Sequence, residues 1–307
     1  MIKHILLSIL VCPLVLGQTG DSLSGSKSIV WGSNHFIEYH PGDLPIIISV
    51  PHDGYLKPDL IADRTKGVYY RDSYTQDIAK QMSDALYIRT GKRPYIILNN
   101  LHRKKLDPNR EMSEAAQGHP IAETAWTEYH AFIDTAESIV QEKFGRGIYI
   151  DLHGHANEIQ RIELGYGFNS EQLDTENADL DQSPYTEMST LTNLLKNSTY
   201  TNSQLLRDTM SFGAMLEKCS IRVCPSPQDP KPRAESFYSG GYSVIRHARD
   251  SEYGIFGFQI EMPLSLRSND GNMLRNASLM VDALIGYLNV QWKSHEWMNH
   301  EVLKVGK

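Results

Sequence analysis

The most regular pattern in the chain is a set of three short apolar runs, each leading directly into residues that can carry chemistry. These runs predict buried β-strands at residues 45–50, 147–150 and 256–260. His52 follows the first run, Asp151 and His153 follow the second, and Glu261 ends the third. Because the carboxyl ends of the strands in an open α/β sheet face the ligand site, we expect these four side chains to lie near one another.

Helical periodicity between these runs sets the fold class. Apolar residues recur at helical spacing in three segments, and one more apolar strand is predicted; the helices span 73–86, 121–144 and 273–292, and the strand spans 94–98. Strands that alternate with helices favour one open α/β sheet covered by helices. The stretch 168–240 is polar and rich in turn residues, so we interpret it as an insertion or lid rather than a second domain.

The N-terminus has the pattern of a targeting signal. Lys3 and His4 precede a mostly apolar stretch, 5–17, and polar residues follow it. That stretch is too short to cross about 30 Å of hydrocarbon, so we predict a cleaved secretory signal peptide over 1–17, with an uncleaved anchor as the alternative. A flexible Ser/Gly-rich segment at 18–29 and one catalytic domain at 30–307 complete the predicted organisation. We expect a secreted protein without a membrane span.

Composition and charge narrow the range of partners. Of the 307 residues, 40% are hydrophobic and 22% are charged, and the formal net charge is −7. A chain with this balance lacks the basic face that a general binder of nucleic acid or anionic membranes needs. We therefore expect a small molecule or a short peptide as the partner, and neither nucleic acid nor membrane.

Secretion would permit a disulfide and glycosylation. Cys219 and Cys224 are the two cysteines that remain after the predicted leader, and we predict that they pair across their short loop. The alternative is two separate buried thiols. Asn197 and Asn276 each begin an acceptor sequence for N-glycosylation, so both are predicted glycosylation sites.

The two histidines at the strand ends are the strongest candidates for metal ligands. A catalytic zinc site takes three protein ligands, commonly imidazoles and carboxylates, and keeps one position open. We therefore assign His52 and His153 to Zn²⁺, with Asp151 orienting an imidazole from behind. His155 is a weaker ligand candidate and could instead contact substrate.

Two aspartates are candidates for the third metal ligand. Asp72 comes just before a predicted helix, where capping the helix N-terminus would also explain it. Asp53, next to His52, is the competitor. We predict Asp72 as the ligand and keep Asp53 as the alternative.

A basic loop follows the predicted strand at 94–98. It carries Arg103, Asn109 and Arg110. Arg110 can bind a carboxylate through two parallel hydrogen bonds and Asn109 can add a third, while Arg103 or Arg110 could also stabilise an oxyanion. The loop therefore predicts an anion site, against the alternative of a solvated basic turn.

Glu261 is the candidate general base. A glutamate that ends an apolar strand is costly to bury unless it has a task or a partner. Beside a zinc-activated water it could take a proton and pass it to the leaving amine. The alternative is a structural salt bridge with Arg267.

These motifs, taken together and in order, resemble the N-formylglutamate amidohydrolase family, a branch of the zinc carboxypeptidase-like fold. The matching segments are 49–54, Arg71-Asp72 with Thr75, Arg103 with 107–110, 151–153 and 259–261. The resemblance implies a single three-layer α/β domain with a central mixed, mostly parallel sheet flanked by helices. It also implies a zinc amidohydrolase with His52 and His153 on zinc, Glu261 as general base, and Asn109 with Arg110 holding the substrate carboxylate.

One departure from zinc carboxypeptidases concerns the first ligand motif. Those enzymes use His-x-x-Glu, whereas Tyr55 stands three residues after His52 here, so the third ligand must come from elsewhere. Tyr242 is either a mobile substrate-facing residue or a turn aromatic. The leading hypothesis is a secreted zinc amidohydrolase that acts on N-acyl amino acids or small acidic peptides. The alternatives are a metallocarboxypeptidase and a non-catalytic binding protein with the same fold.

Overall fold

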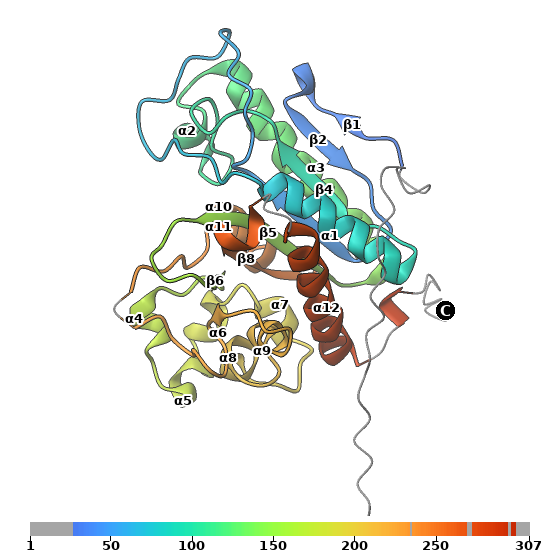
Figure 1. The fold of residues 1–307 in the computed structure, drawn as a ribbon, viewed down its shortest axis with the longest axis vertical. Helices are drawn as coiled ribbons and strands as arrows, with labels where there is room; N and C mark the ends of the chain where they lie inside the picture. Colours follow the sequence, from blue (N-terminus) through green and yellow to red (C-terminus); the bar gives the residue numbers. More distant parts are fainter. Residues whose placement is uncertain (1–26, 234, 269–271, 294–295, 299–307) are drawn as a thin grey trace, which may run out of the picture.

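The computed structural model of the chain describes residues 27–233, 235–268, 272–293 and 296–298. Within these ranges, eight strands form one sheet in the order β1-β2-β4-β3-β5-β8-β6-β7 (Figure 1). The strands are β1 (Val30–Trp31), β2 (Ile37–His40), β3 (Ile46–Val50), β4 (Tyr95–Asn99), β5 (Gly147–His155), β6 (Ile162–Gly165), β7 (Val223–Cys224) and β8 (Ile255–Pro263). The predicted signal peptide, 1–17, lies outside the described residues, as does most of the segment 18–29.

The helices alternate with these strands along the chain. They are α1 (Thr75–Thr90), α2 (Met112–Ala115), α3 (Pro120–Phe144), α4 (Ser170–Leu173), α5 (Asn177–Leu180), α6 (Tyr185–Met188), α7 (Thr192–Leu195), α8 (Asn202–Arg207), α9 (Phe212–Lys218), α10 (Tyr242–Val244), α11 (Leu264–Arg267) and α12 (Met273–Trp292). Two 3-10 helices, η1 (Ser33–His35) and η3 (Glu296–Met298), and one π-helix, η2 (Ile245–Arg249), complete the described elements. The predicted long helices correspond to α1, α3 and α12.

The centre of the sheet is parallel. Strands β4, β3, β5 and β8 run in one direction, while β2 and β6 are antiparallel to their central neighbours. The predicted strands correspond to β3, β4, β5 and β8. Two of them are longer than predicted, because β5 continues to His155 and β8 to Pro263. Asp151, His153 and Glu261 therefore lie inside strands rather than just beyond them.

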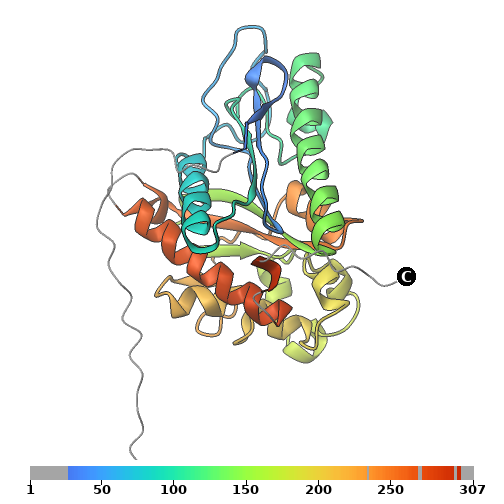
Figure 2. The same ribbon diagram turned by 90° about the vertical axis from the view of Figure 1, so that its right-hand side faces the viewer.

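Helices cover both faces of the sheet. Helices α1 and α12 pack on one face and α3 on the other (Figure 2). Alternate strand residues point to opposite faces, so Ile46 and Ile48 join the core under α1 and α12, while Ile47 and Tyr149 join the core under α3. The predicted fold class, a three-layer α/β architecture around a mixed and mostly parallel sheet, is confirmed.

Helix α3 delivers the chain to the strand that carries most of the chemistry. Pro120 occupies its first turn, where the missing N–H costs nothing. Gly145 ends it in the left-handed conformation, with a φ of 68°, which glycine adopts without steric penalty. Strand β5 starts two residues later. A tight stop of this kind fixes where β5 enters the sheet, and so where Asp151 and His153 lie.

The segment 168–240, predicted as an insertion or lid, folds into α4 to α9 and β7. Helices α4 to α9 lie below β6 and β8 and beside α12 in Figure 1. Its apolar side chains are part of the larger core, including Phe168, Leu205 and Phe212. Among the described helices, none is long and apolar enough to cross a membrane.

The predicted disulfide is wrong, because Cys219 and Cys224 are free thiols in different surroundings. Cys219 directly follows α9, and burial raises the pKa of its thiol, with a smaller contribution from the charge of Asp282. Cys224 lies in β7 opposite Glu163, where burial raises the pKa of its thiol to about 12. The five-residue separation therefore places one thiol at a helix end and the other in the sheet.

One of the two predicted glycosylation sites is also wrong. Asn276 is buried in α12, and its Nδ2, the atom that would carry a glycan, donates a hydrogen bond to the Leu266 carbonyl at 2.9 Å. Asn197 is exposed just after α7 and stays a predicted site.

Candidate metal centre

The order of the sheet brings the predicted ligands together. Strands β3 and β5 are neighbours, and β8 lies on the other side of β5, with Glu261 directly opposite His153. His52 follows the end of β3 by two residues. Asp72 reaches the same place from the loop before α1, and its backbone N–H donates to the His52 carbonyl at 3.2 Å. His52, Asp72, His153 and Glu261 therefore lie together at the carboxyl ends of the central strands.

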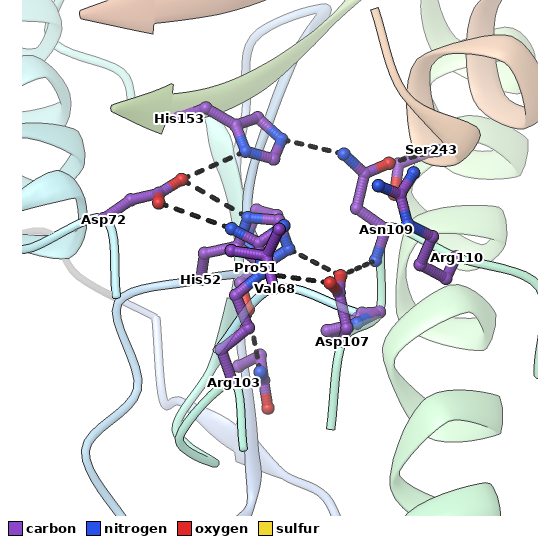
Figure 3. A network of polar contacts seen from close by, with 12 residues as sticks. Pro51, His52, Val68, Asp72, Arg103, Asp107, Asn109, Arg110, His153 and Ser243 are labelled. Carbon is purple, nitrogen blue, oxygen red and sulfur yellow. Dashed lines mark hydrogen bonds and ion pairs between the residues drawn. The ribbon is translucent and has the colours of Figure 1, made fainter. Parts of the chain in front are cut away.

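His52, Asp72 and His153 form a compact triad that could hold a metal ion (Figure 3). Asp72 Oδ2 lies 3.3 Å from His52 Nδ1 and 3.2 Å from His153 Nδ1. All three side chains are buried. Two imidazoles and one carboxylate match the ligand types and the number of a catalytic zinc site.

Carboxylates hold the far nitrogen of each imidazole. His52 Nε2 lies 2.6 Å from Asp107 Oδ1, and His153 Nε2 lies 2.9 Å from Asp151 Oδ2. A carboxylate only accepts hydrogen bonds, so each Nε2 carries a proton and donates it. In the neutral imidazoles the lone pairs are then on Nδ1, and both point toward Asp72. This is the arrangement in which outer carboxylates orient histidine ligands.

The charge on Asp72 also suits a cation. Burial alone would raise the pKa of this carboxyl, but hydrogen bonds from His153 and His52 hold it well below its usual value. The pKa of His153 is well above its usual value, because Asp151 and Asp72 outweigh the effect of burial. Asp72 thus presents a negative charge to both Nδ1 atoms, which favours binding of a cation there.

The outer carboxylates give a test of this geometry. Asp151→Asn removes the anion that orients His153, so we expect zinc affinity to fall about 10–100-fold. Competition with a chromophoric chelator measures this change. Asp179→Asn, the same substitution at an exposed position on α5, is the matched control. Equal affinity in the two variants would mean that Asp151 does not support a ligand.

The structure separates the two candidates for the third ligand. Asp53 is engaged elsewhere, with Oδ1 2.6 Å from Arg71 Nη2 and Oδ2 accepting the Gln76 N–H at 3.0 Å. Asp72 does not cap α1 with its side chain, because its carboxylate points to the two histidines. His155, considered for substrate contact, is also engaged: its Nε2 donates to the Arg161 carbonyl at 2.8 Å.

Glu261 lies beside the triad in the buried part of β8. Burial raises the pKa of Glu261 to about 8, and Asp72 adds to the rise while His153 opposes it. Its Oε1 accepts the Gln259 amide at 2.8 Å, and its buried Oε2 has no hydrogen-bond partner among the described residues. Arg267, the alternative partner, instead donates to the carbonyls of Met262 and His155. Glu261 therefore keeps one carboxyl oxygen available at the site.

The predicted anion loop splits into three different placements. Arg103 borders the triad, with Nη1 3.6 Å from Asp72 Oδ1 and Nε donating to Asp107 at 2.9 Å. Asn109 is buried and engaged: Nδ2 contacts His153 Nε2 at 3.2 Å, and Oδ1 accepts the Ser243 N–H at 2.8 Å. Arg110 is 41% exposed and lies 3.2 Å from Glu114. Of the predicted Asn-Arg pair, Arg110 alone keeps donors open to solvent.

Tyr242 packs against aromatic rings rather than against the triad, and Tyr238 lies four residues before it. Tyr242 contacts the rings of Trp126 and His130. Tyr238 is 43% exposed and its ring lies 6.3 Å from that of His155, and its pKa is raised by burial and then by the charges of Glu261 and Asp72. The sequence holds both tyrosines in one Gly- and Ser-rich loop and offers no signal to choose between them.

Asp107 is the supporting residue that sequence reasoning left without a role. It stands in the predicted anion loop, two residues before Asn109, where a basic turn explains an aspartate as a simple counter-charge. In the structure it contacts His52, Arg103 and, at 3.8 Å, Arg64. The Asp107 carboxylate thus joins the first histidine to the neighbouring guanidinium groups.

The fold resembles solved hydrolase structures at low sequence identity. An N-formylglutamate amidohydrolase from Ralstonia eutropha JMP134 has a TM-score of 0.52 at 13% identity, covering 85% of this chain and 98% of that chain. A metallo-carboxypeptidase from Pseudomonas aeruginosa has a TM-score of 0.40 at 12% identity, covering 83% and 61%. No family model and no curated protein sequence matches the chain. At the level of the fold, the predicted resemblance to N-formylglutamate amidohydrolases is confirmed.

Proposed function

We propose that this protein is a secreted zinc-dependent amidohydrolase that cleaves a C–N bond in N-acyl amino acids or small acidic peptides. The observation that carries this proposal is the buried triad of His52, Asp72 and His153 with Glu261 opposite it. Imidazoles and a carboxylate are ligands that catalytic zinc commonly uses. A nearby group that transfers protons assists the hydrolysis of an amide. Secretion rests on the N-terminal pattern of residues 1–17.

The metal and the residues around the triad have different roles in the proposed hydrolysis. Zinc bound there would supply a Lewis acid that polarises the scissile carbonyl. Glu261 takes a proton from the attacking water through its free Oε2 and returns it to the leaving nitrogen. Arg103 lies at the edge of the triad, where its guanidinium can stabilise negative charge on the former carbonyl oxygen.

Arg110 supports a substrate that carries a carboxylate. Its guanidinium is half exposed and lies next to Asn109, which contacts His153. A cation close to a hydrolytic centre favours an anionic substrate, and a guanidinium can bind a carboxylate through two hydrogen bonds. The small N-acyl group would then face Glu261.

A substrate panel tests the proposal. With zinc-loaded protein, we expect N-formylglutamate and related N-acyl amino acids to be hydrolysed with a higher kcat/KM than dipeptides, with release of free amine as the measurement. Faster release of a C-terminal residue from peptides would instead support a metallocarboxypeptidase. Absence of turnover on the whole panel, with zinc bound, would support the binding protein.

A further inference from the structure

A second cluster of metal-ligand types lies on the α3 side of the sheet. Asp134 and Glu137 are three residues apart on α3 and so share one face of that helix. His247 of the π-helix η2 faces both, with Nδ1 3.4 Å from Asp134 Oδ1 and 3.4 Å from Glu137 Oε1. Their potential ligand atoms all lie within 4.8 Å of one another. This cluster shares no residue with the triad described above.

The hydrogen bond between His247 and His130 determines which nitrogen of His247 is unprotonated. His130 Nε2 lies 3.1 Å from the Pro108 carbonyl, which only accepts, so this nitrogen carries the proton. A neutral imidazole carries a proton on only one nitrogen, so His130 Nδ1 is then an acceptor. His247 Nε2 lies 2.8 Å from that atom and therefore donates to it. A neutral His247 then has its lone pair on Nδ1, aimed at two carboxylates.

One carboxyl oxygen of this cluster has no hydrogen-bond partner in the part of the chain that the structure describes. Glu137 is only 2% exposed, and its Oε1 has no hydrogen-bond partner among the described residues. Arg246 lies near, but its contacts are Asp134 Oδ2 at 3.4 Å and the Tyr242 hydroxyl at 3.3 Å. A bare nitrogen and a buried unpaired carboxylate oxygen thus face each other. A cation between them would satisfy both.

Solvent can reach this cluster. The side chain of Asp134 is 42% exposed. Asp134, Glu137 and Arg246 line an open surface hollow between α3 and the segment that follows η2. An ion can therefore enter without unfolding of the core.

We propose that Asp134, Glu137 and His247 bind a second divalent metal ion of the zinc class. One imidazole and two carboxylates suit zinc, with water filling the remaining position. The ion would link α3 to η2 and orient His247. His247 donates a hydrogen bond to His130, and His130 donates one to the carbonyl of Pro108. Asp107 and Asn109 flank that carbonyl and contact the two histidines of the triad. The second ion is therefore a structural support for the loop behind the first.

Zinc stoichiometry of the full chain tests this assignment. After dialysis against zinc, we expect two zinc ions per chain in the wild type and one in Glu137→Gln, with affinity at the second site lowered by about 100-fold or more, beyond the loss of an outer partner. Glu142→Gln, an exposed glutamate on the same helix, is the matched control and keeps two. If Glu137→Gln does not fold, Asp134→Asn at the half-exposed position replaces it.

The two sites are separated by a variant that removes the first. In the double variant His52→Ala with His153→Ala, one zinc ion should remain, and added zinc should raise the Tm through mass action. Adding Glu137→Gln to this variant should abolish both the remaining zinc and the Tm shift. If the wild type and Glu137→Gln bind equal amounts of zinc, the assignment is wrong, and a protonated Glu137 that donates to His247 explains the cluster. That outcome would leave the proposed hydrolytic function untouched.

Discussion

Replacing Glu261 with glutamine is expected to lower the rate of amide hydrolysis by about 10²–10⁴-fold, the range supplied by a positioned general base. Glutamine has the same shape and can keep the contact with Gln259, but it cannot take a proton from water. The free Oε2 beside the triad is the atom lost. The measurement is kcat on an N-acyl amino acid with zinc-loaded protein.

Metal content and folding separate this effect from a structural one. Glu261 is not among the triad residues, so Glu261→Gln should bind as much zinc as the wild type. Removing a buried carboxyl whose pKa is raised to about 8 should not reduce stability at neutral pH, because desolvation penalises its charged form. The control Glu142→Gln should keep full activity. A variant at Glu261 that retains zinc and turns over normally would remove this residue from the chemistry.

The strand ends could be predicted because their signal is local. Apolar runs such as 45–50 and 147–150 are bounded by turn residues, and the α/β pattern favours placing them in one mostly parallel sheet. Pairing β3 with β5 is what brings His52 to His153, and β8 beside β5 brings Glu261. Short-range periodicity together with one topological rule was therefore enough for the fold and most of the candidate centre.

The supporting residues depend on long-range geometry that periodicity does not encode. Asp107 and Asn109 lie in a turn, and whether they face substrate or a histidine depends on how the loop folds over β5. The resemblance implies that Asn109 binds substrate, and in the structure its Oδ1 accepts the Ser243 N–H while its Nδ2 lies against the His153 ring. The same limit applies to Tyr242 and Tyr238, which share one loop.

The errors outside the site have a similar origin. The two remaining cysteines of a predicted secreted chain suggested a disulfide, yet Cys219 directly follows the end of α9 and Cys224 lies in β7. The sequon at Asn276 lies inside α12, where packing buries the amide. Neither prediction took account of the helix or strand that holds the residue.

The choice between Asp72 and Asp53 predicts the largest difference in metal binding between two similar substitutions. Asp72→Asn removes an anionic ligand, so zinc affinity should fall by more than about 100-fold, beyond the loss expected for an outer partner. Asp53→Asn should keep zinc, because its carboxylate serves Arg71 and Gln76. Zinc per chain after dialysis, with chelator competition for affinity, measures both.

The two variants form a matched pair, because both aspartates are buried and both lie next to His52. Asp53 follows it in the sequence, and Asp72 contacts it in the fold. Asp53→Asn should instead cost stability, about 1–3 kcal/mol, since a buried pair of hydrogen bonds is weakened. Urea unfolding of the metal-free proteins measures that cost without interference from zinc. Zinc loss in Asp53→Asn with retention in Asp72→Asn would reverse the ligand assignment and return the site to the consecutive pair His52 and Asp53. Loss in the Asp72 variant alone would fix the third ligand on the loop before α1, which explains how the chain completes a triad without a glutamate at the position of Tyr55.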